Sequence, residues 1–280
     1  MSLKKLSSVV LLCIMFSMLF TGCGDSAKPV SMRTIGVITK LNLSDSTLNE
    51  KFSKLDTSAQ NSSVEIKQKY VYYKSLDEML KALHTRKINE AVTYKSVARY
   101  VIGQNSDLAQ ATKSGSYSDS FCLAVRKEDK ALLDSLNNAL QAMNSEGTTS
   151  YIAKTYIEFL NPNDEVPITD MPKIDSTETI KVGVTGDFPP FDLINKSGVP
   201  AGFSTTLLAE LSRRTWKNVE IVKISADERA RALTSKRIDV AFWATVSNEK
   251  SLPKDRDNPA ELELTTPYFE DEIAYLVLKK

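Results

Sequence analysis

Histidine and cysteine are scarce in this chain, and their scarcity excludes several kinds of site. The 280 residues contain three cysteines and one histidine, His84. One histidine supplies neither a usual metal site nor a nucleophile–base pair, so we expect His84 to be a surface helix residue. The sequence also lacks a phosphate-binding loop, a G-x-S-x-G motif and a metal-ligand cluster. We therefore expect no metal, no cofactor and no catalytic residue.

An excess of charge of either sign is missing as well. Lysine and arginine number 36, aspartate and glutamate 35, and the net charge is +1. Proteins that bind nucleic acid normally carry a basic face, so nucleic acid is not an expected partner. Hydrophobic residues make up 42% and charged residues 25% of the chain, which suits one large globular domain or two small ones.

Residues 1–22 have the pattern of an export signal. Two lysines precede an almost wholly apolar run over residues 9–20, which is too short for an anchor helix. Thr21-Gly22-Cys23 follows the run, a boundary that resembles the lipobox of bacterial lipoproteins. The resemblance implies a lipid on Cys23, a tether over residues 23–32 and an extracytoplasmic protein anchored to the membrane. An ordinary secretory signal with an incidental cysteine is the alternative.

The three cysteines exclude a disulfide within the mature chain. Cys13 lies in the signal and Cys23 is assigned to the lipid, which leaves Cys122 without a partner cysteine. The apolar segment around Cys122 predicts a strand, where this residue is expected to be a small buried hydrophobe.

An internal repeat organises the rest of the chain. Residues 75–83 and 225–233 both begin with S-x-x-E, the pattern of a helix capping box. A short apolar strand is predicted before each helix, at 34–38 and 180–184, and another after it, at 88–92 and 238–242. Alternating strands and helices indicate an α/β fold with a sheet covered by helices, and two copies imply two lobes.

The segment between the two copies predicts two helices and a connection. Leucines and a methionine recur at helical spacing over residues 130–143, and Gly147 is expected to end that helix. A second, short helix is expected over residues 151–160. Three prolines and several acidic residues then make residues 161–178 a linker.

Four stretches in the last third of the chain carry a family resemblance. V-G-V-T-G-D-F-P-P-F-D begins at Val182, and three more follow at residues 198–203, 238–241 and 267–271. In order and spacing they resemble the extracellular solute-binding proteins of polar amino acid ABC transporters. The resemblance implies a two-lobed fold of the periplasmic binding protein type 2 and a small ligand held between the lobes. It also implies a monomer that delivers its ligand to a membrane permease.

Compared with that family, the order of the segments is rotated. By the resemblance, residues 33–115 form lobe 2, residues 116–160 the C-terminal part of lobe 1, and residues 179–280 its N-terminal part. Residues 161–178 would join the old chain ends. Such a circular permutation is plausible because domain termini usually lie on the surface, often close together. Two truncated fragments fused by accident are the alternative.

Loops that follow strands supply the expected ligand site. The family resemblance places Phe188 against the ligand, next to Thr185, although packing in the core is an alternative for this aromatic. On the neighbouring loop, the residues expected to face the ligand are Trp243 and Thr245, which directly follow a strand. The lobe 2 residues assigned to the site are Thr39, Ser44 and Tyr94; Ser44 or Asp45 is expected to cap a helix whose free N–H groups could hold an anion.

Both charged anchors that the family uses for an α-amino acid are replaced. Ser251 stands where the family has the arginine that clamps the α-carboxylate, with Lys250 and Arg256 nearby. Tyr94 stands where the family has the aspartate that binds the amino group. The expected ligand is therefore a small polar or aromatic solute, an amino acid or a related compound. We further expect Trp243→Ala to abolish the ligand response with little effect on the unliganded protein.

Two other functions remain open from the sequence. The chain could be a ligand-sensing or degenerate scaffold lipoprotein that serves a membrane receptor. It could also resemble cyclohexadienyl dehydratases, enzymes that share this fold. The enzyme hypothesis requires an acid in the cleft, for which Asp187, Asp45 and Glu249 are the candidates, and fold alone does not decide between these functions.

Overall fold

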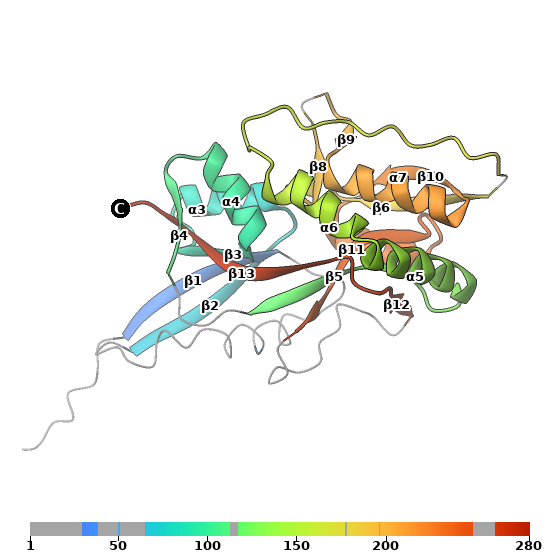
Figure 1. The fold of residues 1–280 in the computed structure, drawn as a ribbon. Helices are drawn as coiled ribbons and strands as arrows, with labels where there is room; N and C mark the ends of the chain where they lie inside the picture. The colour runs from blue at the N-terminus through green and yellow to red at the C-terminus, as the bar shows by residue number, and fades with distance from the viewer. Residues whose placement is uncertain are drawn as a thin grey trace, which may run out of the picture.

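The computed structural model describes residues 30–38, 50, 65–112, 117–176, 178–195, 197–248 and 261–280. Ten strands form one large mixed sheet in the order β10-β6-β11-β5-β13-β3-β1-β2, with β12 beside β5 and β4 beside β13. Helices cover the sheet (Figure 1). The predicted mixed α/β architecture is confirmed. Within these ranges no helix is long and apolar enough to cross a membrane.

The first half of the sheet comes from the first copy of the repeat. Its three parallel strands pair in the order β3-β1-β2, and α3 and α4 pack against it. The elements are β1 (Val30–Ile38), β2 (Glu65–Tyr73), α3 (Leu76–His84), β3 (Glu90–Tyr94), α4 (Lys95–Gln104) and β4 (Leu108–Gln110).

The second half combines the other copy with the segment before it. β10, β6 and β11 are parallel, and β5 joins this group antiparallel to β11. Its strands are β5 (Ser118–Arg126), β6 (Thr179–Val184), β10 (Asn218–Lys223), β11 (Val240–Ser247) and β12 (Leu262–Leu264), with a small sheet of β7 (Asp187–Phe188), β8 (Asp192–Ile194) and β9 (Pro200–Ala201). Its helices are α5 (Lys130–Ser145), α6 (Thr148–Ala153), the π-helix η2 (Lys154–Glu158), α7 (Phe203–Thr215), the 3₁₀ helix η3 (Ala226–Glu228) and α8 (Arg229–Thr234).

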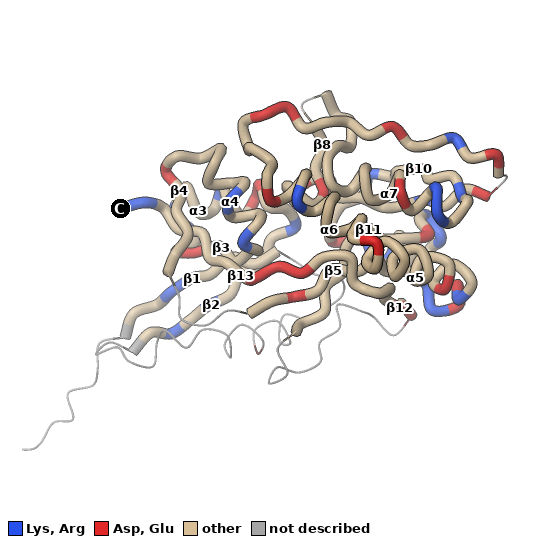
Figure 2. The backbone as a smooth tube through the Cα atoms, viewed as in Figure 1, with Lys and Arg blue, Asp and Glu red and all other residues tan. Residues whose placement is uncertain are grey.

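One strand, β13 (Phe269–Leu278), runs through both halves. Its first part, Phe269–Glu272, pairs with β5, and its second part, from Ile273 to Leu276, pairs with β3. Figure 2 shows the acidic stretch of β13 in red near the point where the strand leaves one half for the other. The two halves are therefore joined by a continuous, hydrogen-bonded backbone rather than by a loose connection.

The alternation of side chains along β5 divides the core into two layers. Phe121, Leu123 and Val125 lie in the larger core cluster, which also contains buried residues of α5 and α7. Ala124 lies on the other side with residues of α8. Because successive side chains point to opposite faces of a strand, a strand buried on both faces reads as a continuous apolar run. Cys122 is buried within this run, as predicted, and burial raises the pKa of its thiol to about 12.

The serine bond of the first capping box forms, with Glu78 Oε2 accepting from Lys74 N at 3.3 Å, one residue before Ser75; the second box does not form. Ser75 Oγ accepts from Glu78 N at 3.2 Å, and α3 buries Met79 and Leu83. Ser225 makes no such bond: the second helix begins as the 3₁₀ turn η3, so the prediction was wrong there. The Glu228 carboxylate accepts from Arg231 and Arg237 and also bonds to the Ser225 side chain.

The two helices predicted before the linker are present. α5 matches the expected helix and is followed by Gly147 in the left-handed region, at φ 77°. The second begins earlier than expected, at Thr148, and continues as η2 to Glu158. Residues 161–176 contain no helix or strand and run past α7 toward β6 (Figure 1). Val166 anchors this segment in a small apolar cluster with Leu193 and Ala201.

Candidate functional site

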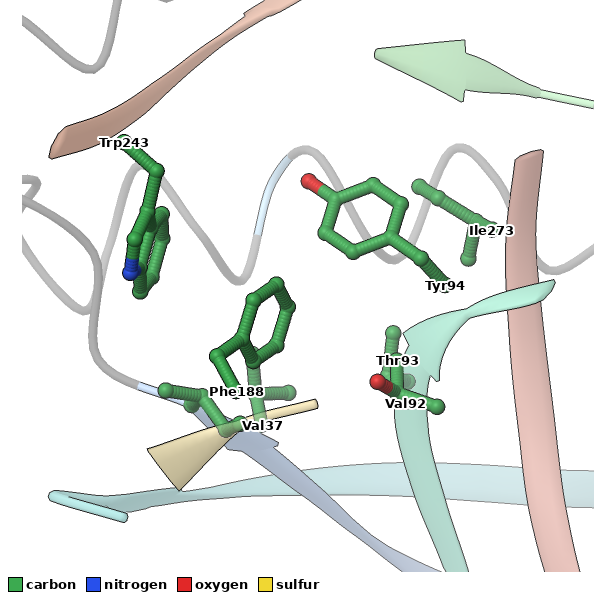
Figure 3. Close-up of a pocket in the computed structure, with 8 residues that line it drawn as sticks. Val37, Val92, Thr93, Tyr94, Phe188, Trp243 and Ile273 are labelled. Atoms are coloured by element: carbon green, nitrogen blue, oxygen red, sulfur yellow. The ribbon is translucent and has the colours of Figure 1, made fainter. Parts of the chain in front are cut away.

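A small cavity lies where the two halves of the sheet meet. Its volume is about 30 Å³, enough for roughly two water molecules. The first half contributes Val37, Ile38, Val92, Thr93, Tyr94 and Ile273, and the second half contributes Phe188 and Trp243 (Figure 3). None of these eight side chains is charged. We call this space and its lining the cleft.

The three aromatic residues predicted to contact a ligand contact one another instead. Phe188 stacks on Trp243 with the ring centroids 4.8 Å apart, and meets Tyr94 edge to face at 6.0 Å. Phe188 and Trp243 are each 2% exposed and Tyr94 is 5% exposed. The three residues selected from the sequence thus lie together, and in this structure their rings leave a cavity of only about 30 Å³.

A buried arginine supports the far side of the Trp243 ring. The Arg229 guanidinium carbon lies 3.5 Å from the ring centroid, a cation–π contact in a fully buried place. Its Nε donates to the carbonyl of Ala226 at 3.0 Å and its Nη1 to that of Trp243. Sequence reasoning missed Arg229, although the repeat held a signal: the equivalent position in the first copy is Met79, a buried helix residue.

The loop that carries Phe188 is fixed by a buried carboxylate. Asp192 accepts from Thr185 N at 2.7 Å, from Thr185 Oγ1 at 3.1 Å and from Gly186 N at 3.1 Å. Burial raises the pKa of Asp192 to about 6, although these hydrogen bonds oppose the rise. Gly186 has φ +71°, and a Cβ there would meet Ile194 at 2.3 Å, so only glycine fits. Thr185 therefore positions this loop and does not line the cleft.

Tyr94 ties the first half to a carboxylate of the second. Its hydroxyl donates to Asp119 Oδ2 at 2.7 Å, and Asp119 is fully buried in β5. Opposite Asp119 in the antiparallel pair stands Asp271 of β13, which accepts from Ser96 N at the start of α4 at 2.9 Å. Burial raises the pKa of Asp271 to about 6. An aspartate two residues before the apolar run of β5 was the available signal for this tie.

An ion pair also joins the two halves outside the cleft. Lys74, just before α3, places its Nζ 2.9 Å from Asp227 Oδ2 in η3. The pair lies between the starts of the two repeated helices, so it links equivalent points of the two copies. The pKa of Lys74 is raised by its hydrogen bond to Asp227, and the same bond lowers the pKa of Asp227.

The remaining predicted site residues fall elsewhere. Thr245 is buried in β11 opposite Phe121 and does not line the cleft. Of the residues that the sequence analysis assigned to the site or to the lipid anchor, the following lie outside the described ranges: Cys23, Thr39, Ser44, Asp45, Glu249, Lys250, Ser251 and Arg256. Asp187, the described candidate for an acid, does not line the cleft either, and burial raises its pKa. Among the residues that the structure describes, no cluster of three or more histidine, cysteine or acidic side chains could hold a metal ion.

The half of the chain that contributes Phe188 and Trp243 has recognisable relatives. Residues 180–280 match the family model of the bacterial extracellular solute-binding proteins, family 3. The resemblance noted in the sequence is confirmed over this segment. It contains one wall of the cleft and the whole of β13.

Two curated proteins are similar to this chain over about a third of its length. One is a probable ABC transporter arginine-binding protein of Chlamydia trachomatis, 29% identical over 106 residues, which is 37% of each chain. The other is a probable amino-acid ABC transporter-binding protein of Haemophilus influenzae, 28% identical over 96 residues, 34% of this chain and 35% of the relative. The match thus spans little more than a third of the length of either relative.

Solved structures with a similar fold cover more of this chain, at low sequence identity. The ligand-binding core of GluR0 with L-glutamate has a TM-score of 0.44 and 10% identity, over 91% of this chain and 86% of that one. The ligand-binding component of a Staphylococcus aureus ABC-type import system, with zinc bound, has a TM-score of 0.45 and 14% identity, over 88% and 66%.

Proposed function

We propose that this protein captures a small polar or aromatic solute between two lobes and delivers it to an ABC-type permease outside the cytoplasm. The observation that carries the proposal is the family match over residues 180–280, which includes Phe188 and Trp243 of the cleft. Both named relatives are binding proteins of ABC transporters. The uncharged cleft wall at the junction of the two halves is the natural place for the solute.

A thermal-shift screen over amino acids, amines, dipeptides and aromatic acids tests this function. A ligand that binds only the folded protein stabilises it by about 2.7 kcal/mol at a hundredfold excess over its dissociation constant. We expect at least one class to raise the melting temperature in a saturable way, without turnover. Turnover of the compound would instead support the dehydratase-like enzyme, for which Asp187 is the described acid.

The circular permutation is part of this proposal. The elements of the first half, then β5, α5 and α6, precede the segment that matches the family, and residues 161–178 lie between them. A rearranged chain that begins at Thr179, runs to Lys280 and continues from Arg33 to Leu160 should fold to the same structure. Its circular dichroism spectrum and ligand response should equal those of residues 24–280. An unfolded rearranged chain beside a folded 24–280 would contradict the permutation.

The lipid anchor is proposed from the sequence. We expect mass spectrometry of the membrane-bound protein to find a diacylglyceryl group on Cys23. The Cys23→Ser variant should lose the lipid and, once cleaved or truncated, leave the membrane, since acyl chains contribute about 0.8 kcal/mol per buried methylene. An unmodified Cys23, or cleavage at another residue, would contradict the anchor.

A second candidate, a ligand-sensing or scaffold lipoprotein, is favoured by one observation. The cleft holds only about 30 Å³ and its rings already contact one another. Capture of a permease from solubilised membranes by the liganded protein would support transport. Capture of a receptor by the unliganded protein, with no permease, would support the scaffold.

A further inference from the structure

The cleft contains one hydroxyl that the closed structure leaves unsatisfied. Thr93 is 4% exposed, lines the cleft, and its Oγ1 has no hydrogen-bond partner. In Figure 3 this oxygen lies on the side of Thr93 that faces Phe188. Buried hydroxyls are nearly always hydrogen-bonded, and an unsatisfied one costs stability. A partner that arrives from outside the chain would remove that cost.

Three other side chains near the cleft, those of Tyr94, Trp243 and Arg229, make contacts with protein atoms. The Tyr94 hydroxyl donates to Asp119. The Trp243 indole N–H lies 3.5 Å from Thr185 Oγ1. The Arg229 guanidinium lies against the Trp243 ring and donates to backbone carbonyls. The described wall of the cleft therefore offers a ligand aromatic and aliphatic surface and the Thr93 hydroxyl.

A zwitterion does not suit this wall. A buried carboxylate or ammonium group needs an opposite charge or several hydrogen bonds, because desolvation of an unpaired charge is expensive. An uncharged aromatic ring, in contrast, gains from stacking or edge-to-face contact with Phe188, Trp243 and Tyr94. Because the cleft holds about 30 Å³, these rings must part when a ligand enters.

We infer that the cleft takes an uncharged solute with an aromatic or apolar body and one hydrogen-bonding group, which is held by the Thr93 hydroxyl. The inference rests on the proposed solute-binding function and narrows its ligand class. Zwitterionic amino acids are then excluded as ligands, and neutral aromatic compounds such as phenols and indoles remain as candidates.

Matched pairs of probes test the ligand class on the mature protein. Indole is compared with L-tryptophan and phenol with L-tyrosine, each at millimolar concentration, by thermal shift and by isothermal titration calorimetry. We expect indole and phenol to raise the melting temperature and their zwitterionic partners to leave it unchanged. Preference for the zwitterions would overturn the inference and leave solute binding in place. No response to any probe or to any compound of the wider screen would contradict both.

The role of Thr93 is tested with Thr93→Val, which keeps the shape and removes the hydroxyl. The wild type should bind phenol about two- to tenfold more tightly than toluene, the range of one neutral hydrogen bond. Thr93→Val should bind the two equally and should melt at a higher temperature without ligand. The control is Thr205→Val, because the buried Thr205 hydroxyl donates to the Gly202 carbonyl at 3.0 Å; this variant should melt at a lower temperature. A phenol preference that survives in Thr93→Val would overturn the assignment.

Discussion

Replacement of Trp243 by alanine should strongly destabilise the unliganded protein. The ring is 2% exposed and lies between Phe188 on one face and the Arg229 guanidinium on the other. Truncation of a buried tryptophan costs about 3–5 kcal/mol. In a chain of this size that loss lowers the melting temperature by about 6–20 °C. The structure thus reverses the expectation from the sequence that Trp243 affects ligand binding alone.

Urea denaturation followed by circular dichroism measures this loss in the chain from residue 24 onward. The control is Trp216→Phe, because Trp216 is 63% exposed and its replacement should change the free energy of unfolding by no more than about 0.5 kcal/mol. Trp243→Phe keeps an aromatic ring against Phe188, so it should retain more of the stability than Trp243→Ala does. This variant is the better one for ligand tests.

The result that would refute the reasoning is specific. If Trp243→Ala unfolds within about 1 kcal/mol of the wild type, the Trp243 ring does not pack between Phe188 and Arg229 in solution. The halves would then stand apart in the unliganded protein, with Trp243 on an open wall. The same variant should in that case lose the ligand response and nothing else, as the sequence suggested.

Two further predictions concern charge. Burial raises the carboxyl pKa of Asp192 and Asp271 to about 6, so the folded state binds these protons more tightly than the unfolded state does. The stability that this proton binding contributes is fully present below about pH 4 and is lost as the pH rises through about 6. Between pH 5 and pH 7.5 the expected loss is about 1 kcal/mol per group. Urea midpoints measured at pH 5 and pH 7.5 should show this loss of stability, and Asp192→Asn should make the loss smaller. A loss in both Asp192→Asn and Asp271→Asn that is as large as in the wild type would contradict the prediction. Lys74→Glu, which sets a like charge against Asp227, should increase the radius of gyration in small-angle scattering at low salt, and the exchanged pair Lys74→Asp with Asp227→Lys should restore it; an unchanged radius in Lys74→Glu would show that this ion pair does not hold the halves together.

The elements that depend on local sequence could be predicted, and their failures have local causes. α3 and α5 follow from a helical apolar period, and Gly147 after α5 adopts the expected left-handed conformation. The second capping box did not form: that helix begins as the 3₁₀ turn η3, and Glu228 also accepts from Arg231 and Arg237, of which Arg237 lies outside the helix. A four-residue motif does not contain that competing partner.

The pairing of distant segments could not be predicted in the same way. β13 joins the two halves through β5 and β3, and Asp271 holds the start of α4 from 175 residues away in the sequence. Such contacts depend on which strands become neighbours, and each strand by itself is only an apolar run. The family resemblance could suggest that the chain crosses between lobes, but it gave no partner for Asp119 or Asp271.

The site illustrates the same limit at the level of side chains. Residue type and position after a strand selected Phe188, Trp243 and Tyr94, and these residues do meet in the cleft. Whether an aromatic ring contacts a ligand or another ring depends on how far the halves close. That distance is a property of the whole fold, and no local pattern contains it.

The charges near the cleft now fall into a consistent arrangement. A carboxylate and a guanidinium lie behind the rings: Asp119 accepts from the Tyr94 hydroxyl, and Arg229 lies over the Trp243 ring. In that position they bond to the aromatic residues and to backbone carbonyls rather than face the cavity. The charged groups therefore fix the orientation of the rings, and none of the described side chains that line the cleft is charged. Under the inference drawn above, this arrangement selects a ligand by ring shape and one hydrogen bond, and the Thr93 hydroxyl, rather than an ionic anchor among the described residues, sets the affinity.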